Sequence, residues 1–144
     1  MDAHFYNVDI SWTKDRQGEM SSPELSTTVE IATPPQFPKG VEGIWSPEHL
    51  FTSAVASCLM TTFLSIAENS KLEFSCFSCK SSGKLEQVEG KFLMTEVILE
   101  PTVTIINESD REKAERVLQK SEQHCLISNS IKSKITMRTN IVTF

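Results

Sequence analysis

Four cysteines are the side chains of this sequence best suited to covalent chemistry: Cys58, Cys76, Cys79 and Cys125. A cysteine reacts as its thiolate, so a reactive thiol needs a neighbour that lowers its pKa from about 8.5. Residues 1–6 lack the basic head and apolar run of a secretion signal. We therefore expect a cytoplasmic protein whose thiols are free, catalytic or metal-bound, because a reducing compartment disfavours structural disulfides.

Cys58 and Cys125 each allow two interpretations. Cys58 falls in the middle of a predicted helix, where a cysteine is either a small core residue or a redox thiol activated by a nearby arginine. Cys125 falls at the end of a second predicted helix, and a helix C-terminus disfavours an anion. Cys125 is therefore either a packing residue or a resolving thiol that attacks an oxidised sulfur, and it is a poor primary nucleophile.

Cys76 and Cys79 form a C-x-x-C motif in a predicted strand, where residues three apart point to opposite faces. Zinc binding would need a second pair of ligands, and the histidines are isolated from one another in the sequence. We expect neither a metal site nor thioredoxin-like chemistry here. The sequence also lacks a nucleophile-elbow, P-loop or dinucleotide-binding motif.

The amino-acid composition limits the classes of protein to which this chain can belong. The chain has 144 residues, of which 39% are hydrophobic, and a formal net charge of -5. These values predict a single globular domain, residues 1–144, without the basic surface of a nucleic-acid-binding protein. Residues 50–67 carry no charge, but six of these 18 residues bear hydroxyl groups and no Lys or Arg flanks their start. We therefore expect a central helix of the fold and not a membrane span.

Hydrophobic periodicity and the positions of capping residues and prolines predict the strands and helices that position these residues. Strands are predicted around residues 6–13 and 25–31, with a connecting loop at residues 14–22 and the first of these strands half-buried. Ser46 is a suitable N-cap, and Pro47 and Glu48 suit the first turn of a helix that reaches about Asn69.

The second half of the chain repeats the alternation of strands and helix. Strands are expected at residues 74–86 and 92–106, separated by a turn at residues 88–91, with the second strand broken or bulged at Pro101. A capping box at residues 109–112 opens a second helix, residues 128–130 form a turn, and residues 135–139 form a closing strand. The order ββ-α-ββ-α-β predicts an α+β fold with largely antiparallel sheet.

The motifs resemble those of the OsmC/Ohr family over nearly the whole chain. Residues 45–51, followed by Ala56-Ser57-Cys58, resemble the helix signature of that family, and residues 124–130 resemble its second cysteine signature. The resemblance implies an OsmC-like fold with antiparallel sheets around a long central helix and an intertwined homodimer with active sites at the subunit interface. Leu126 follows Cys125 where Ohr-type members usually carry proline, so this sequence is more similar to the broader OsmC-like branch.

The resemblance also implies an activity, a thiol-dependent peroxidase acting on hydroperoxides. Cys58 matches the peroxidatic cysteine and Cys125 the resolving cysteine, while Arg16 matches a loop arginine that stabilises the thiolate and the peroxide. Glu48 would orient Arg16 through a charge-assisted pair. Since Glu48 precedes Cys58 by about 15 Å of helix, it would act across the dimer or through a folded-back arginine loop.

The implied cycle uses an external dithiol or lipoyl-type reductant and no bound cofactor or metal. Several apolar residues either line a hydroperoxide pocket or simply form the core: Phe51, Val55, Leu59, Phe63 and Ile127. Two other functions fit the same fold: a binding protein for a small hydrophobic ligand, without catalysis, and a thiol redox sensor.

Overall fold

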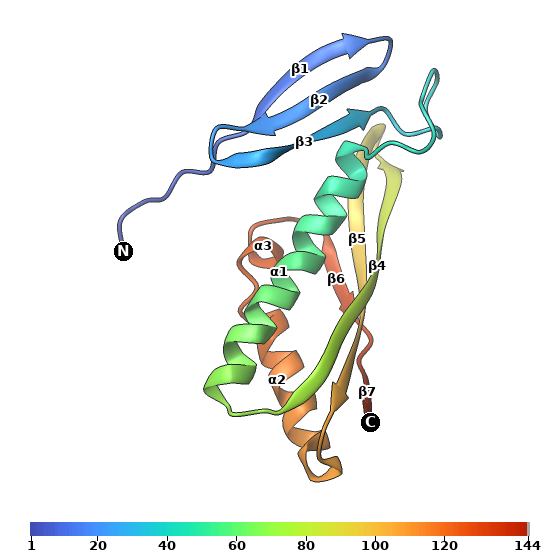
Figure 1. Cartoon of the computed structure of the whole chain (residues 1–144). Coiled ribbons are helices and arrows are strands. Elements are labelled where there is room, and N and C mark those ends of the chain that lie inside the picture. Colours follow the sequence, from blue (N-terminus) through green and yellow to red (C-terminus); the bar gives the residue numbers. More distant parts are fainter. Residues whose placement is uncertain (144) are drawn as a thin grey trace. The chain divides into compact units, whose positions relative to one another are not determined.

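Three strands near the N-terminus form an antiparallel sheet in the computed structural model, which describes residues 1–143 (Figure 1). β1 (Asp9–Lys14) pairs with β2 (Gln17–Ser22), and β2 pairs with β3 (Leu25–Ala32). The sheet therefore follows the order of the sequence, with short turns between neighbouring strands.

The chain forms two compact units, Met1–Leu50 and Phe51–Phe144. The first unit contains the three-stranded sheet, and the second contains the four-stranded sheet and nearly all of the helical residues. The expectation that the whole chain is one domain stays a prediction.

The strand β2 corrects the predicted loop over residues 14–22. Its sequence, QGEMSS, contains no β-branched or aromatic residue, so its strand conformation depends on pairing with neighbours on both sides. Gly18 pairs with both Trp12 and Ile31. A Cβ at Gly18 would lie 2.5 Å from the carbonyl oxygen of Ser11, so the close approach of the strands requires glycine.

The prediction of a half-buried first strand is wrong for the chain by itself. All six residues of β1 are exposed. Ile10 is 60% exposed and Trp12 is 77% exposed. The alternation of apolar and polar residues therefore marks an apolar face that the chain itself leaves uncovered.

The central helix has the predicted bounds. α1 extends over Pro47–Asn69. The hydroxyl oxygen of Ser46 accepts a hydrogen bond from the amide of His49 at 3.1 Å, which confirms Ser46 as the N-cap.

A long hairpin follows α1. It consists of β4 (Phe74–Val88) and β5 (Lys91–Ile105), paired antiparallel along their length. The turn between them confirms the prediction: Glu89 and Gly90 have φ values of 51° and 82°, as a two-residue turn with two left-handed positions requires.

The predicted break or bulge of the strand at Pro101 is wrong, because β5 continues through it and pairs there with β4 without a register shift. On the side of β5 away from β4, β6 (Lys134–Met137) pairs with residues 96–99 and β7 (Asn140–Thr143) pairs with residues 102–105. Pro101 falls between these two registers, where neither C-terminal strand needs a hydrogen bond from it.

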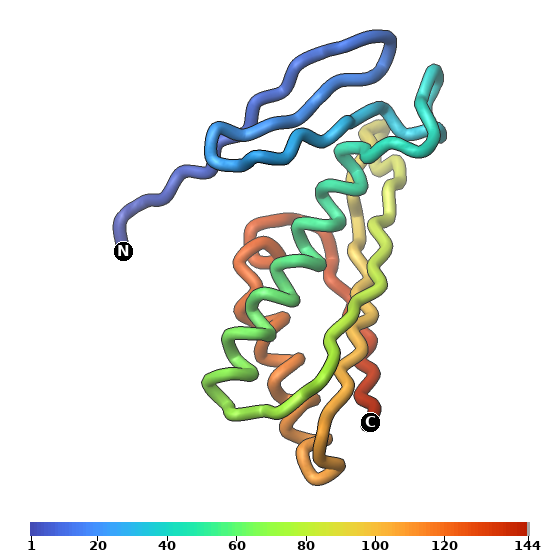
Figure 2. Tube along the Cα trace, in the orientation of Figure 1, coloured from blue at the N-terminus to red at the C-terminus, as the bar shows by residue number. Residues whose placement is uncertain are grey.

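The C-terminal strands differ from the expected single closing strand. Two short strands replace it, and both are parallel to β5. The chain leaves β5, passes through the helical segment in orange and returns to the same sheet (Figure 2). This crossover explains the parallel pairing, because a hairpin return would be antiparallel.

The second helix begins differently from the predicted capping box at residues 109–112. A 3-10 turn, Glu108–Asp110, leads into α2 (Arg111–Gln123), and Asp110 at the N-cap makes no side-chain capping bond. The guanidinium of Arg111 instead donates to both carboxylate oxygens of Glu108 and to the carbonyl of Ile141. The inward face of α2 consists of four buried residues: Ala114, Val117, Leu118 and Ser121.

Two clusters form the core of the second unit. One joins α1, β5 and α2, and its buried members are Phe63, Ala67, Leu72, Val103, Ile105, Ala114, Val117 and Leu118. The other joins α1 and β5, and its buried members are Val55, Leu59, Val97 and Leu99. α1 has the length and hydropathy of a membrane span. Its buried residues nevertheless recur every three or four positions and pack on β5 and α2, as in the core helix of a soluble protein.

Replacing Leu118 by alanine is predicted to destabilise the second unit by about 2–5 kcal/mol, because Leu118 is fully buried and its loss leaves a cavity. Leu126→Ala is the matched control: Leu126 is 67% exposed, and its replacement should change the free energy of unfolding by less than about 0.5 kcal/mol. Urea unfolding at equal protein concentration measures both. Equal effects would contradict the assignment of the core.

Candidate functional site

Cys58 lies on the inward face of α1, between Val55 and Phe63 in the buried stripe. Its side chain is 9% exposed, and its sulfur lies 3.9 Å from the hydroxyl oxygen of Thr62, one turn further along the helix. The helix therefore supplies one weak polar contact to the thiol, and the remaining partners come from elsewhere in the unit.

Cys125 lies at a helix start, which corrects the prediction that it ends the second helix. α2 ends at Gln123, His124 is its C-cap, and Cys125 is the N-cap of a short helix, α3 (Leu126–Asn129). The carbonyl of Cys125 accepts the amide of Asn129 at 3.0 Å, which closes the single turn of α3. The predicted turn at residues 128–130 is thus a helical turn, and Cys125 is 1% exposed.

The structure brings the two cysteines together as free thiols, near enough for Cys125 to affect the pKa of Cys58. Burial opposes ionisation of Cys58, but hydrogen bonds from Cys125 and from the backbone of Ile127 outweigh it and lower the pKa of the Cys58 thiol. Thr62 and the backbone of Leu126 add to this effect. The start of α3 thus lowers the pKa of the Cys58 thiol, which the middle of its own helix does not do.

Cys125 behaves in the opposite way. Burial raises the pKa of its thiol, and the neighbouring Cys58 raises it further, against the lowering effect of hydrogen bonds from Ser128. Of the two sulfurs, Cys58 is therefore the one that ionises first, and Cys125 stays protonated and donates to it. The pair has the asymmetry that a nucleophile and a resolving thiol need.

Ser128 is a site residue to which the sequence analysis gave no role. Its hydroxyl oxygen is buried and has no hydrogen-bond partner among the oxygen and nitrogen atoms of the described residues. Ser128 follows Cys125 by three residues, and its hydroxyl lowers the pKa of the Cys125 thiol. Two signals in the sequence point to it: Ser128 lies within the second cysteine signature, residues 124–130, and it follows the N-cap by three residues.

The apolar residues expected to line a pocket or form the core belong to the core. Val55, Leu59 and Phe63 are fully buried, and Phe51 and Ile127 are partly buried against the cluster that contains Val55 and Leu59. Ile127 therefore anchors α3 beside α1, which holds the start of α3 at the Cys58 sulfur.

Arg16 and Glu48 belong to the other unit, Met1–Leu50. Arg16 is exposed in the two-residue turn between β1 and β2, and its carbonyl accepts the amide of Thr33 at 3.1 Å. Glu48 lies in the first turn of α1, as predicted. The structure defines these positions within their own unit, so the joint action of Arg16 and Glu48 on Cys58 stays a prediction.

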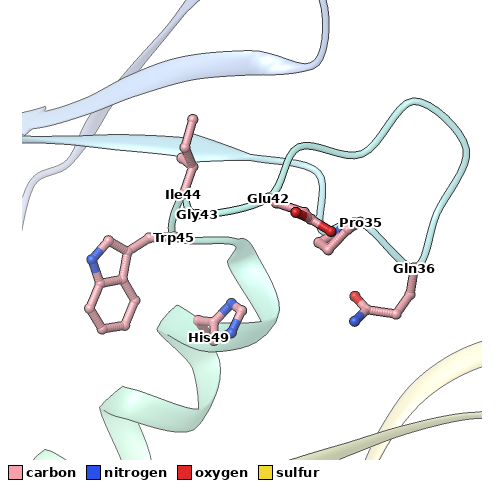
Figure 3. A pocket seen from close by; sticks show the side chains of 7 residues that line it. All are labelled: Pro35, Gln36, Glu42, Gly43, Ile44, Trp45 and His49. Atoms are coloured by element: carbon pink, nitrogen blue, oxygen red, sulfur yellow. The ribbon is translucent and has the colours of Figure 1, made fainter.

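The first unit also contains a pocket of about 450 Å³ at the start of α1 (Figure 3). His49 lies in it, held by the hydroxyl of Ser46 at 2.7 Å from Nδ1, with the ring of Trp45 edge-on at 6.0 Å between centroids. Ser46 is fully buried as the N-cap, so its contact with His49 fixes the helix start. Ser46 is not placed as a nucleophile. The remaining lining residues are Pro35, Gln36, Glu42, Gly43 and Ile44.

The C-x-x-C motif has the geometry expected of a strand. Cys76 is exposed, while Cys79 packs against the cluster of Val55 and Leu59, and burial raises the pKa of the Cys79 thiol. Among residues 1–143, no group of three or more Cys, His, Asp or Glu side chains is placed to hold a metal ion.

The sequence of this chain is similar to those of known proteins. The sequence model of OsmC-like proteins matches residues 40–140, which include both cysteine segments. The uncharacterized protein YmaD of Bacillus subtilis is 26% identical over 142 residues, 95% of this chain and 92% of that protein.

Solved structures show the same fold. An OsmC-like protein of unknown function from Vibrio cholerae superposes with a TM-score of 0.86 at 21% identity, over 95% of this chain and 99% of that one. An organic hydroperoxide resistance protein OsmC from Legionella pneumophila gives a TM-score of 0.77 at 21% identity, over 99% of both chains. With its two sheets, its long helix and a family match over 40–140, this chain belongs to the OsmC-like protein family.

Proposed function

We propose that this protein is a thiol-dependent peroxidase that reduces hydroperoxides to alcohols or water, with Cys58 as the peroxidatic and Cys125 as the resolving cysteine. The observation that carries the proposal is the contact between two free thiols, of which Cys58 has a lowered pKa and Cys125 a raised one. The description of a structural relative as an organic hydroperoxide resistance protein supports the same activity.

The first step oxidises Cys58. Its thiolate attacks the distal oxygen of the hydroperoxide, the O–O bond breaks, and the sulfur becomes a sulfenic acid. The leaving alkoxide takes a proton and departs as an alcohol. The amides at the start of α3 and the hydroxyl of Thr62 stabilise the attacking thiolate through the hydrogen bonds described above.

The second and third steps return the protein to its starting state. Cys125 attacks the sulfenic sulfur of Cys58, which forms a disulfide and releases water. An external dithiol, of lipoyl or another type, then reduces the disulfide by thiol exchange and leaves as its own disulfide. The cycle needs two protein thiols and a reductant, and no bound cofactor or metal.

Arg16 and Glu48 complete the proposed site. The guanidinium of Arg16 would favour the thiolate and hold the peroxide oxygens, and Glu48 would orient that guanidinium through a bidentate pair. Helix spacing separates Glu48 from Cys58 by about 15 Å. We therefore propose that Arg16 and Glu48 reach the cysteine pair across a homodimer interface or through the folded-back β1–β2 turn.

Exposed apolar side chains support the homodimer. On α1, Met60 is 39% exposed and Leu64 is 42% exposed, and Ile10 and Trp12 of β1 are more exposed still. Apolar surface of this extent on a soluble chain marks an interface. We propose that a second copy of the chain covers it, and that the protein works in the cytoplasm, where reduced thiols persist.

The decisive test is the fate of the thiols in fully reduced protein. One equivalent of an organic hydroperoxide, or of hydrogen peroxide, is expected to produce a Cys58–Cys125 disulfide within the mixing time of a manual assay. Alkylation followed by disulfide mapping by mass spectrometry measures it, and the faster oxidant indicates the substrate class.

Matched cysteine variants separate the cycle from incidental oxidation. Cys58→Ser should abolish the reaction, Cys125→Ser should stop it at the sulfenic acid, and Cys76→Ser and Cys79→Ser should leave it unchanged. Four intact thiols under excess peroxide would refute the peroxidase and favour the ligand-binding protein. Oxidation without turnover in the presence of dithiol would favour the redox sensor.

The pH dependence of the first step should follow the thiolate of Cys58. Because its pKa is lowered, the rate of peroxide reduction should fall as the pH drops through a midpoint that lies below the ordinary thiol value of about 8.5. Stopped-flow rates against pH measure the midpoint. Arg16→Gln should move the midpoint upward and Arg138→Gln should not; identical profiles for the two variants would exclude Arg16 from the site.

Ser128→Ala is predicted to slow reduction of the disulfide more than its formation. The more exposed sulfur, Cys58, is the one a dithiol reaches, so Cys125 leaves as a thiolate and Ser128 donates a hydrogen bond to it. Loss of a hydrogen bond to a charged group corresponds to about a tenfold lower rate. Single-turnover reduction by dihydrolipoamide measures the effect, with Ser130→Ala as control; equal rates in Ser128→Ala and wild type would contradict the role.

A further inference from the structure

A second binding site is suggested by a groove of about 370 Å³ between the C-terminal end of α1 and the helix α2. Its volume is within the range of pockets that take small organic ligands. The groove lies wholly in the second unit, and six residues line it: Ile66, Ser70, Lys113, Arg116, Val117 and Lys120.

The rim of the groove is cationic. Lys113, Arg116 and Lys120 recur along one side of α2 at separations of three and four residues. Like charges at these separations are neighbours on a helix surface and destabilise it. The cluster is also a local exception, because the chain as a whole has a net charge of -5.

Lys113, Arg116 and Lys120 form no ion pair within 4.0 Å among residues 1–143, although Glu112 precedes Arg116 by one turn of α2. The ion pairs formed by residues 1–143 join other side chains, Lys84 with Glu86, Arg111 with Glu108, and Arg138 with Glu100. Glu115, on the same helix, is engaged with Thr139 and Gln119 instead.

One of the three cations has a structural role. Lys113 donates to the carbonyl of Lys71 at 3.3 Å, just beyond the end of α1, where a positive charge is favourable. Arg116 and Lys120 are exposed, and the contact between Lys113 and Lys71 does not involve them. These two side chains are therefore available to an anion from solution.

The floor of the groove is apolar. Val117 is 4% exposed and belongs to the core cluster of α1, β5 and α2, and Ile66 packs against the same cluster. A bare anion such as phosphate would pair with the rim and leave the exposed part of Ile66 in contact with water. A ligand that uses both parts needs an anionic head joined to an apolar body.

We propose that this groove binds the anion of a medium-chain fatty acid, with its carboxylate between Arg116 and Lys120 and its chain on Ile66. A guanidinium and a planar carboxylate form two parallel hydrogen bonds, which suits Arg116 to the head. Ile66 follows Cys58 by eight residues, about 12 Å along the helix. The site is thus separate from the thiol pair and does not depend on the peroxidase activity.

Titration of the full-length protein with sodium octanoate, below its critical micelle concentration, tests the proposal by amide chemical-shift mapping and calorimetry. We expect saturable shifts in the last two turns of α1 and in α2. Each buried methylene should tighten binding about fourfold, so acetate and inorganic phosphate should bind more than tenfold more weakly. Equal affinity for all three, or shifts confined to other regions, would overturn the proposal.

Two double variants with the same change in charge provide the control. Arg116→Gln with Lys120→Gln should weaken octanoate binding at least tenfold, whereas Lys84→Gln with Lys91→Gln should leave it unchanged. All four side chains are exposed, so circular dichroism should show both variants folded. Cys58→Ser should bind octanoate as the wild type does, and unchanged affinity in the Arg116 and Lys120 variant would exclude the groove.

Discussion

The buried stripe of α1 is the constraint on which the reactive pair depends. Val55, Leu59 and Phe63 must face β5 to fill the core, and Cys58 shares that face. A rotation of the helix by one residue, about 100°, would expose Phe63 and turn the sulfur away from α3. Close packing of large side chains thus fixes the direction of a small one.

The chemistry of Cys58 comes from its neighbours and not from its own helix. In the middle of a helix the backbone donors are already used, and burial opposes the thiolate. The turn at Cys125 brings unused amides and a second thiol to the sulfur, and the same burial keeps Cys125 protonated. A difference between two buried cysteines therefore arises from which of them receives hydrogen bonds.

Sequence patterns predicted the elements that carry strong local signals. The bounds of α1 follow from Ser46 and Pro47, and the turn at Gly90 follows from its need for a positive φ. β2 was missed because its residues have little strand preference of their own, and the break at Pro101 was wrong because the gap between two later strands accommodates it. Such features depend on pairing partners that no local window contains.

The candidate site was predictable to a different degree. The pairing of Cys58 with Cys125 came from resemblance to a family, since periodicity alone left both as possible core residues. Ser128 escaped notice because its role depends on a short helix that its own sequence, LISN, does not signal. Roles for Arg16 and Glu48 at Cys58 were predicted from their positions in the family motifs. Both residues belong to the first unit, whose geometry does not test those roles.

The parallel pairing of β5 with the last two strands has a consequence for synthesis of the protein. Glu96 pairs with Lys134, and Ile127 of α3 and Ile135 of β6 pack against the same core cluster, so the segment that lowers the pKa of Cys58 shares its packing with residues near the end of the chain. Chains fold during translation from the N-terminus as their segments become available. A nascent chain therefore carries Cys58 without the hydrogen bonds of the α3 segment, and the pKa of its thiol falls only when translation has delivered the final strands.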